Sequence, residues 1–130
     1  MTKISNNIYL FDASEKPLGR FASKAAGILR GKNLVDFAPN HVPDNIVVII
    51  NANKVFLTGR KEESKQYFHH TNHPGGIKSR SFSVLKKNSP EEIIKLAIRR
   101  MLPNNRLTSD LMKNLKIFSG VDHPYKEINK

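Results

Sequence analysis

Three histidines lie within five positions of one short stretch, YFHHTNHPGG, which runs from Tyr67 to Gly76. His69, His70 and His73 carry imidazoles that can ligate metals, transfer protons or contact a polyanion. Because these three roles need different neighbours, the surrounding residues indicate which of them the chain supports.

The sequence around the histidines lacks the residues that would complete a metal site or a catalytic site. No carboxylate lies between Gln66 and Ile77 to complete a hard metal site or to orient an imidazole. The chain has no cysteine, which excludes thiolate zinc sites, cysteine nucleophiles and disulfides. No nucleophile elbow or phosphate-loop motif occurs. We therefore predict no metal, no cofactor and no catalytic residue, with distant aspartates as the one remaining route to a metal site.

The residues that follow the histidines favour contact with a nucleic acid. Pro74 and the glycines after it disfavour a helix, and Gly75 and Gly76 leave backbone N–H groups accessible. Lys78 and Arg80 follow closely. This pattern is typical of a loop against a sugar–phosphate backbone, with imidazoles that stack or donate hydrogen bonds. The alternative is a flexible glycine turn whose histidines are incidental.

The net charge also points to a polyanionic partner. Twenty-two Lys and Arg against 11 Asp and Glu give a net charge of +11 and a pI near 10.1. Such an excess attracts polyanions, whose condensed counterions are released on binding. The cations are dispersed along the chain, which favours a folded body that meets phosphate on several faces over a merely basic soluble protein. The candidate RNA-binding residues are Lys16, Arg20, Lys24, Arg30, Lys32, Arg60, Lys61, Lys65, His69, His70, His73, Gly75, Gly76, Lys78, Arg80, Arg99, Arg100, Arg106 and Lys113.

Length and composition are typical of one globular domain. We expect residues 1–130 to form a single domain, with an extended tail from about residue 120. The longest apolar run, Ile46 to Ile50, is far too short to cross a bilayer, and the N-terminus lacks a signal-peptide pattern. We therefore expect a soluble intracellular protein with no membrane partner.

The elements that position these residues begin with a strand and a helix. Asn7 to Asp12 is rich in β-branched and aromatic residues, which predicts a strand. Pro17 suits the first turn of a helix, and Gly31 is a natural stop. Between them, Arg20 and Lys24 lie away from the apolar stripe. That stripe consists of Leu18, Phe21, Ala22, Ala25, Ile28 and Leu29.

Further extended segments are predicted in the middle and at the end of the chain. Asn45 to Asn51 is a continuous apolar run, typical of a strand buried on both faces of a parallel sheet. Lys54 to Leu57 is predicted as a second short strand, and Gln66 to His69 as an extended segment. Thr108 to about Asn114 suggests a short helix, and Leu115 to Ser119 a last strand.

The clearest helix signal starts at Ser89. Ser89 suits the N-cap, Pro90 the first helical position, and Glu92 completes a capping box, while Pro103 ends the helix. Strand–helix alternation over one small domain predicts an α/β fold, with a small sheet covered by helices. The predicted buried stripe of this helix is Ile93, Ile94, Ala97, Ile98 and Met101.

Five motifs in order give the chain a resemblance to a known family. The motifs are PLGRFAS (Pro17–Ser23), LRGK (Leu29–Lys32), INANKVFLTGRK (Ile50–Lys61), KQYFHHTNHPGG (Lys65–Gly76) and MLP (Met101–Pro103). With these motifs at the family's spacing, the chain resembles the bacterial form of large-subunit ribosomal protein thirteen over about nine-tenths of its length.

The resemblance implies a three-layer α/β/α fold with a small, mostly parallel central sheet. It also implies a non-catalytic role in the cytoplasmic ribosome, where such a protein binds large-subunit (23S-type) rRNA, contacts neighbouring large-subunit proteins and supports early assembly. Small-molecule substrates are not expected. Two alternatives are a free regulator that binds messenger RNA and a small α/β enzyme with a nucleotide or metal site; the missing motifs count against the enzyme.

The chain departs from the family pattern at several positions. Pro43 precedes Asp44 where the family usually has glycine, and Arg100 replaces the glycine before the MLP motif. The family's leucine-glycine-arginine is LTS at Leu107–Ser109, and its histidine-rich tail is HPYKEI at residues 123–128. These departures indicate a divergent lineage.

Overall fold

The central feature of the computed structural model, which describes residues 2–5 and 7–125, is a four-stranded sheet. Its order is β1-β2-β3-β6; β1 is antiparallel to β2, whereas β2, β3 and β6 run parallel. The predicted α/β fold with a small, mostly parallel sheet is therefore confirmed. The strands are β1 (Thr2–Ser5), β2 (Ile8–Asp12), β3 (Ile46–Ile50) and β6 (Leu115–Ile117).

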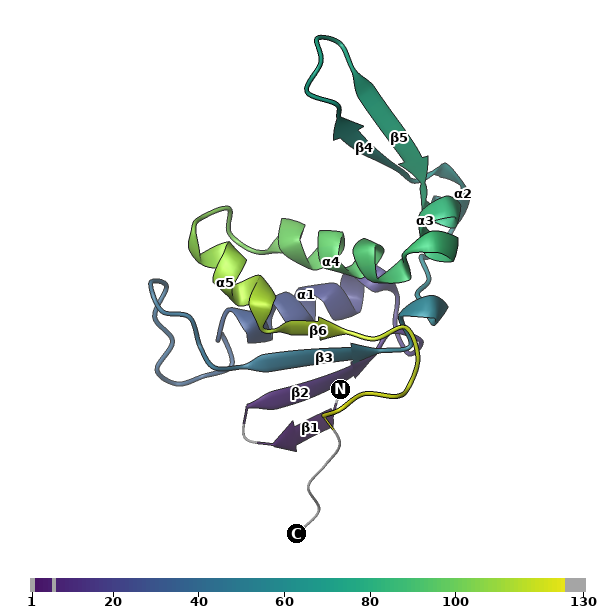
Figure 1. Ribbon diagram of the computed structural model, residues 1–130. Helices are drawn as coiled ribbons and strands as arrows, with labels where there is room; N and C mark the ends of the chain where they lie inside the picture. Colours follow the sequence, from purple (N-terminus) through teal and green to yellow (C-terminus); the bar gives the residue numbers. More distant parts are fainter. Residues whose placement is uncertain (1, 6, 126–130) are drawn as a thin grey trace.

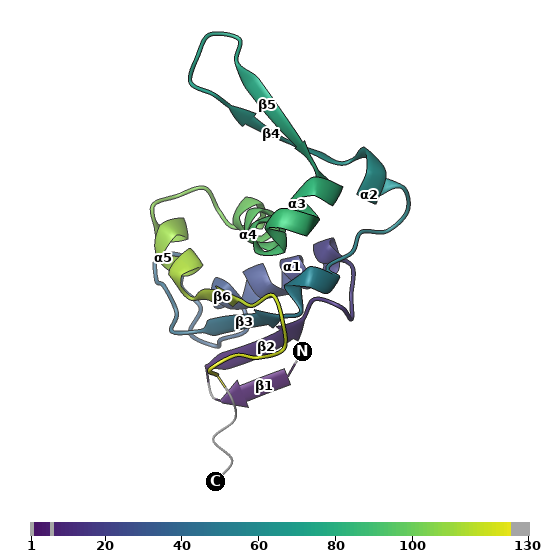
Figure 2. The same ribbon diagram turned by 45° about the vertical axis from the view of Figure 1, so that its right-hand side comes forward.

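Strand β3 is central because its side chains are apolar on both faces. Val47, Val48 and Ile49 have no exposed surface, as the continuous apolar run predicts. Val47 and Ile49 belong to the core cluster under the helices. Val48 points to the other face by strand alternation, and there the segment after β6 runs along the sheet (Figures 1 and 2). The sheet thus lies between helices and an extended segment.

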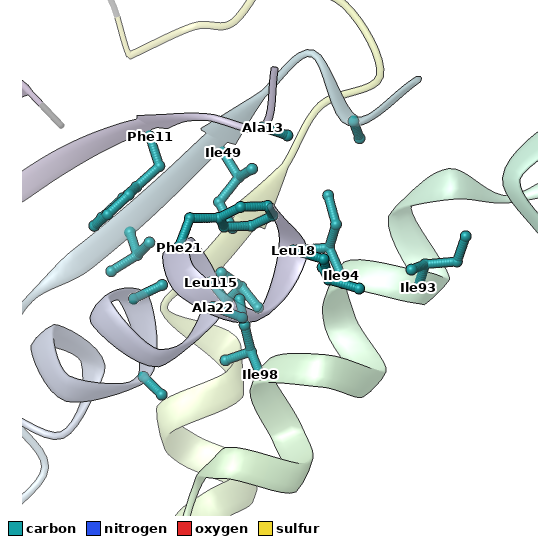
Figure 3. Packing of buried hydrophobic residues seen from close by; sticks show 14 of the residues in the cluster. Phe11, Ala13, Leu18, Phe21, Ala22, Ile49, Ile93, Ile94, Ile98 and Leu115 are labelled. Atoms are coloured by element: carbon teal, nitrogen blue, oxygen red, sulfur yellow. The ribbon is translucent and has the colours of Figure 1, made fainter. Parts of the chain in front are cut away.

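Two amphipathic helices form most of the core with this sheet. Helix α1 (Leu18–Leu29) packs against β3, and α4 (Pro90–Met101) packs against α1 and beside β6. Figure 3 shows Phe21 of α1 between the sheet and α4. The predicted apolar stripe of α1 is buried throughout. Gly31 ends the helix with φ +83°, a conformation that favours glycine.

A β-hairpin projects from this body, as Figures 1 and 2 show. Strands β4 (Gln66–His70) and β5 (Ile77–Ser81) pair antiparallel and form a sheet of their own. Short helices flank the hairpin, and another precedes β6. They are α2 (Lys61–Ser64), α3 (Phe82–Asn88) and α5 (Leu107–Lys113). The sequence patterns predicted β4 and α5 but missed β1, β5, α2 and α3.

The predicted strand at Lys54–Leu57 is wrong. Residues Ala52–Lys54 form a 3₁₀ turn, and residues 55–57 of the described chain pair with no strand. The segment is apolar because it packs on the core: Val55 has no exposed surface. The carbonyl of Phe56 also accepts a hydrogen bond from the Leu18 N–H at 3.1 Å. This loop therefore satisfies a donor at the start of α1.

Two details predicted for α4 are also wrong. Ser89 precedes the helix, but its side chain makes no capping hydrogen bond, and Glu92 lies 4.0 Å from Arg80 instead. Met101 is 46% exposed, whereas Ile94 and Ile98 are buried. The last turn of α4 thus extends past the core. The predicted last strand is shorter than expected and ends at Ile117, and the tail beyond residue 125 lies outside the described residues.

Candidate nucleic-acid interface

The hairpin separates the three histidines. His69 and His70 are successive residues of β4 and point to opposite faces, while His73 lies in the turn. All three are exposed. Within residues 2–5 and 7–125, no three His, Asp or Glu side chains come together as a metal site. The three imidazoles therefore lie on the surface at different places of the hairpin.

Strand pairing gives the hairpin two chemically different faces. Tyr67 lies opposite Arg80, and His69 lies opposite Lys78, so these four side chains share one face. We call this the inner face because Tyr67, at 8% exposure, packs against the body.

The other face, the outer face, is more apolar. Phe68 lies opposite Ser79, and His70 lies opposite Ile77. Phe68 and Ile77 are both largely exposed. The alternation of β4 and β5 thus puts cations on one face and apolar surface on the other.

The inner face continues into a groove on the body. One hollow lies between the start of α1, the α2 region and the end of α4, and an adjoining hollow lies between the hairpin and α4. Tyr67, Leu96 and Arg100 line both hollows. We call the combined surface the basic groove. Its cationic and imidazole side chains are Arg20, Lys61, Lys65, His69, Lys78, Arg80 and Arg100.

Tyr67 is the centre of this groove. Its hydroxyl is buried and, among the described residues, has no hydrogen-bond partner. Burial raises the pKa of Tyr67, with the positive charge of Arg100 acting in the opposite direction. The Lys65 ammonium lies 5.4 Å from the ring centroid, within cation–π range. The hydroxyl is therefore a protonated donor, and an anionic group in the groove would satisfy it.

A neighbouring hollow extends the cationic surface along α4 towards α5. Arg99 and Arg100 line it, together with Lys95. Sequence reasoning did not include Lys95 or Tyr67 among the candidate residues. Lys95 could have been found from its spacing, since it lies four residues before Arg99 on the same helix. Tyr67 gave no such signal, because only the tertiary contact with α4 puts its hydroxyl in the groove.

The other candidates lie outside these hollows. Lys113 already has a partner, since its ammonium lies 2.7 Å from the Asp110 carboxylate. Arg30 is partly buried, and its guanidinium lies 5.8 Å from the Phe37 ring centroid. The remaining ones are at least partly exposed on other parts of the surface: Lys16, Lys24, Lys32, Arg60, His70, His73, Gly75, Gly76 and Arg106.

Both glycines of the hairpin have reasons within the chain itself. Gly75 has φ +70°, a left-handed conformation that side chains rarely adopt. A Cβ at Gly76 would lie 2.0 Å from the Thr71 hydroxyl oxygen, too close without movement. The backbone conformation therefore favours glycine at position 75, whereas the closeness of Thr71 favours it at position 76. Around Gly75 there is open space, since no atom lies within 4 Å of a Cβ built there.

Comparison with known proteins identifies the family of this chain. The family model described as Ribosomal protein L13 matches residues 6–124. This chain belongs to that family.

Curated relatives agree with the L13 assignment along almost the whole chain. The chain is 47% identical to "Large ribosomal subunit protein uL13" of Halorhodospira halophila, over 93% of the chain and 85% of the relative. Proteins of the same name from Bacillus cereus and Aquifex aeolicus are 44% and 42% identical, each over 95% of the chain and 86% of the relative. The resemblance seen in the motifs is thereby confirmed.

Arg100 lies where the hollows meet. It is exposed and lines all three hollows described above. Its guanidinium therefore adds positive charge to each of them.

In the part of the chain that the structure describes, no helix is both long and apolar enough to span a bilayer.

Proposed function

We propose that this chain is a structural constituent of the large subunit of the cytoplasmic ribosome. There it binds large-subunit (23S-type) rRNA, contacts neighbouring large-subunit proteins and supports early assembly, without catalysis. The names of its L13 relatives support the assignment. The observation that carries the RNA contact is the basic groove, where helices α1 and α4 and the hairpin place cations around one buried tyrosine hydroxyl.

The groove is suited to a sugar–phosphate backbone. Arg20, Lys65 and Arg100 carry donors that match phosphate oxygens, and guanidinium forms such contacts in a bidentate way. Tyr67 adds a neutral donor between them. Phosphate contacts of this kind fix orientation and supply most of the sequence-independent affinity.

A salt series tests the phosphate contacts. If about six phosphates are contacted, a log–log plot of affinity for 23S-type rRNA against salt has a slope of roughly −4 to −5. Arg100→Ala should lower both affinity and slope because it removes a groove cation. Lys54→Ala is the matched control, since Lys54 is an exposed lysine that lines none of these hollows. A flat salt response, or equal effects of the two variants, would remove the groove as the RNA contact.

Sedimentation distinguishes the ribosomal role from regulation of messenger RNA. Endogenous protein should remain stoichiometric with large subunits after a high-salt wash. A protein recovered mainly with messenger RNA, free of subunits, would instead be a regulator and would contradict the proposal.

A further inference from the structure

The outer face of the hairpin carries apolar surface that the chain itself leaves uncovered. Phe68 is 65% exposed and Ile77 is 66% exposed. Because Phe68 pairs with Ser79 and His70 pairs with Ile77, the two apolar residues are diagonal neighbours on one face. Phe68 also borders the groove, but most of its surface faces outward. An aromatic and an aliphatic side chain thus form a small platform. The hairpin that carries it projects from the body (Figures 1 and 2).

The charge around this platform indicates an anionic partner. Residues 64–90 contain no Asp or Glu, whereas they contain five Lys and Arg and three His. Two of these cations have acidic neighbours from outside the segment: Arg80 lies 4.0 Å from Glu92, and Lys86 lies 3.7 Å from Glu62. A protein partner whose surface carries both acidic and basic residues would not favour a segment that carries basic residues alone. A nucleic acid combines the two properties that fit: it carries phosphate for the cations and flat bases for the platform.

We propose that the hairpin enters an rRNA loop or junction and that its outer face stacks against an unstacked nucleobase. Phe68 supplies the stacking ring, with Ile77 beside it, while Lys78 and Arg80 on the inner face bind the adjoining backbone. In a fully paired A-form helix the base faces are covered, so the hairpin recognises RNA whose bases are splayed out. This inference rests on the proposed function and names the kind of RNA structure that the hairpin binds.

His70 is held beside the platform. Its Nδ1 accepts a hydrogen bond from the Asn72 backbone N–H at 3.0 Å, and Asn72 adopts a left-handed φ of 62°. With Nδ1 occupied as an acceptor, the proton of the neutral imidazole is on Nε2, which is left as a donor. The turn therefore fixes a hydrogen-bond donor on the same face as Phe68, where the edge of a stacked base or a ribose hydroxyl would accept it.

Substitutions at Phe68 test the stacking contact with the full-length chain. Base–aromatic stacking is worth about 1–3 kcal/mol, so Phe68→Ala should weaken binding to a 23S-type rRNA transcript by about 5- to 150-fold. Phe68→Tyr should bind like the wild type, while Phe68→Leu, which keeps apolar area without a ring, should behave like Phe68→Ala. Val84→Ala is the matched control because Val84 is a half-exposed apolar residue on α3, outside the hairpin.

The salt dependence separates stacking from charge. Phe68→Ala should leave the slope of the log–log salt plot unchanged, whereas Lys78→Ala should reduce it by about one. The Phe68 effect should disappear on a perfectly paired RNA duplex. Phe68→Ala, Lys78→Ala and the wild type should have the same thermal unfolding curve, because neither substitution removes a buried side chain.

The outcomes distinguish this inference from the proposed function. If the wild-type chain does not bind rRNA, the proposed function itself fails. If the wild type binds but Phe68→Ala binds equally well, only the stacking contact is overturned. If Phe68→Ala binds rRNA normally but is excluded from large subunits while Phe68→Leu enters them, the platform docks a protein, which also overturns the inference.

Discussion

The central strand of the body buries its apolar residues, whereas the hairpin exposes apolar residues to solvent. In the body, Val47, Val48 and Ile49 have no exposed surface, and the helices and the C-terminal segment cover them. In the hairpin, Phe68 and Ile77 are about two-thirds exposed. The body also exposes some apolar residues, such as Val35 and Val121, but its central strand is buried on both faces. The difference teaches that burial within the chain accounts for the apolar strand of the body but not for the two neighbouring apolar residues on the outer face of the hairpin.

The two regions also differ in how they are held. A two-stranded hairpin alone is marginally stable in water, and this one is anchored at its base. Tyr67 is buried there, and the Phe82 N–H donates to the Lys65 carbonyl at 3.0 Å where the hairpin joins α3. Beyond that base the strand pairing and the hydrogen bonds of the turn maintain its shape. The arm can therefore carry side chains chosen for binding, at little cost to the body.

The largest effect that tests this difference between body and hairpin is expected in the body. Phe21 is 1% exposed, and Phe21→Ala should lower the free energy of unfolding by about 3–5 kcal/mol through lost burial and the cavity left behind. Arg20, its neighbour on α1, is exposed and lines the basic groove. Arg20→Ala should change stability by less than about 0.5 kcal/mol while weakening RNA binding. Denaturant unfolding and filter binding measure the two effects, and the reverse pattern would show that the faces of α1 are misassigned.

An intermediate effect is expected in the hairpin turn. Gly75→Val forces a β-branched residue into φ +70°, which should cost about 1–3 kcal/mol of local stability. Hydrogen exchange reports it at the Thr71 N–H, which donates to the Gly76 carbonyl at 3.0 Å. Gly75→Val should also fail to enter large subunits.

Gly75→Asn is the informative control for that variant, because asparagine tolerates a left-handed φ. It should preserve exchange protection but still weaken RNA binding, because a side chain then occupies the open space through which the backbone approaches phosphate. Normal RNA binding of Gly75→Asn would show that the glycine serves turn geometry alone.

The smallest effect is expected on the stability of the body at acidic pH. Asp12 is partly buried, which tends to raise its pKa, but hydrogen bonds from Ser14 and Asn51, with the charge of Lys54, lower its pKa below the usual 3.8. The folded state therefore binds fewer protons than the unfolded state. Stability from Asp12 is present above pH 3.8 and is lost as the pH falls through the lower folded-state value.

Asp12→Asn should accordingly reduce the loss of stability in acid and cost about 0.5–1.5 kcal/mol near neutral pH for each hydrogen bond lost. Unfolding free energies measured from pH 7 down to about pH 2 test this prediction. RNA binding at neutral pH should not change, since Asp12 lies outside the basic groove. An identical acid profile for the variant and the wild type would contradict the role of Asp12.

Local pattern alone determined several parts of this protein. The apolar run at Ile46–Ile50 could only be covered on both faces, and the 3.6-residue stripe on α1 could only face a core, so both predictions hold. Pro74 and the glycines excluded a helix, and the structure has a hairpin turn there. Motif order determined the family. The strand, the helix and the turn could be predicted because each depends on residues close in sequence and on whether those residues are apolar or polar.

Only the tertiary structure decided which cations lie together. Arg20, Lys65, Lys78 and Arg100 come from elements far apart in the chain, and the packing of α4 on α1 and the hairpin base brings them around Tyr67. The same packing leaves Met101 exposed and buries Val55 in a segment, Lys54–Leu57, that forms no strand. The physical reason is that exposure and grouping depend on which surfaces long-range contacts cover, and no local pattern contains that information.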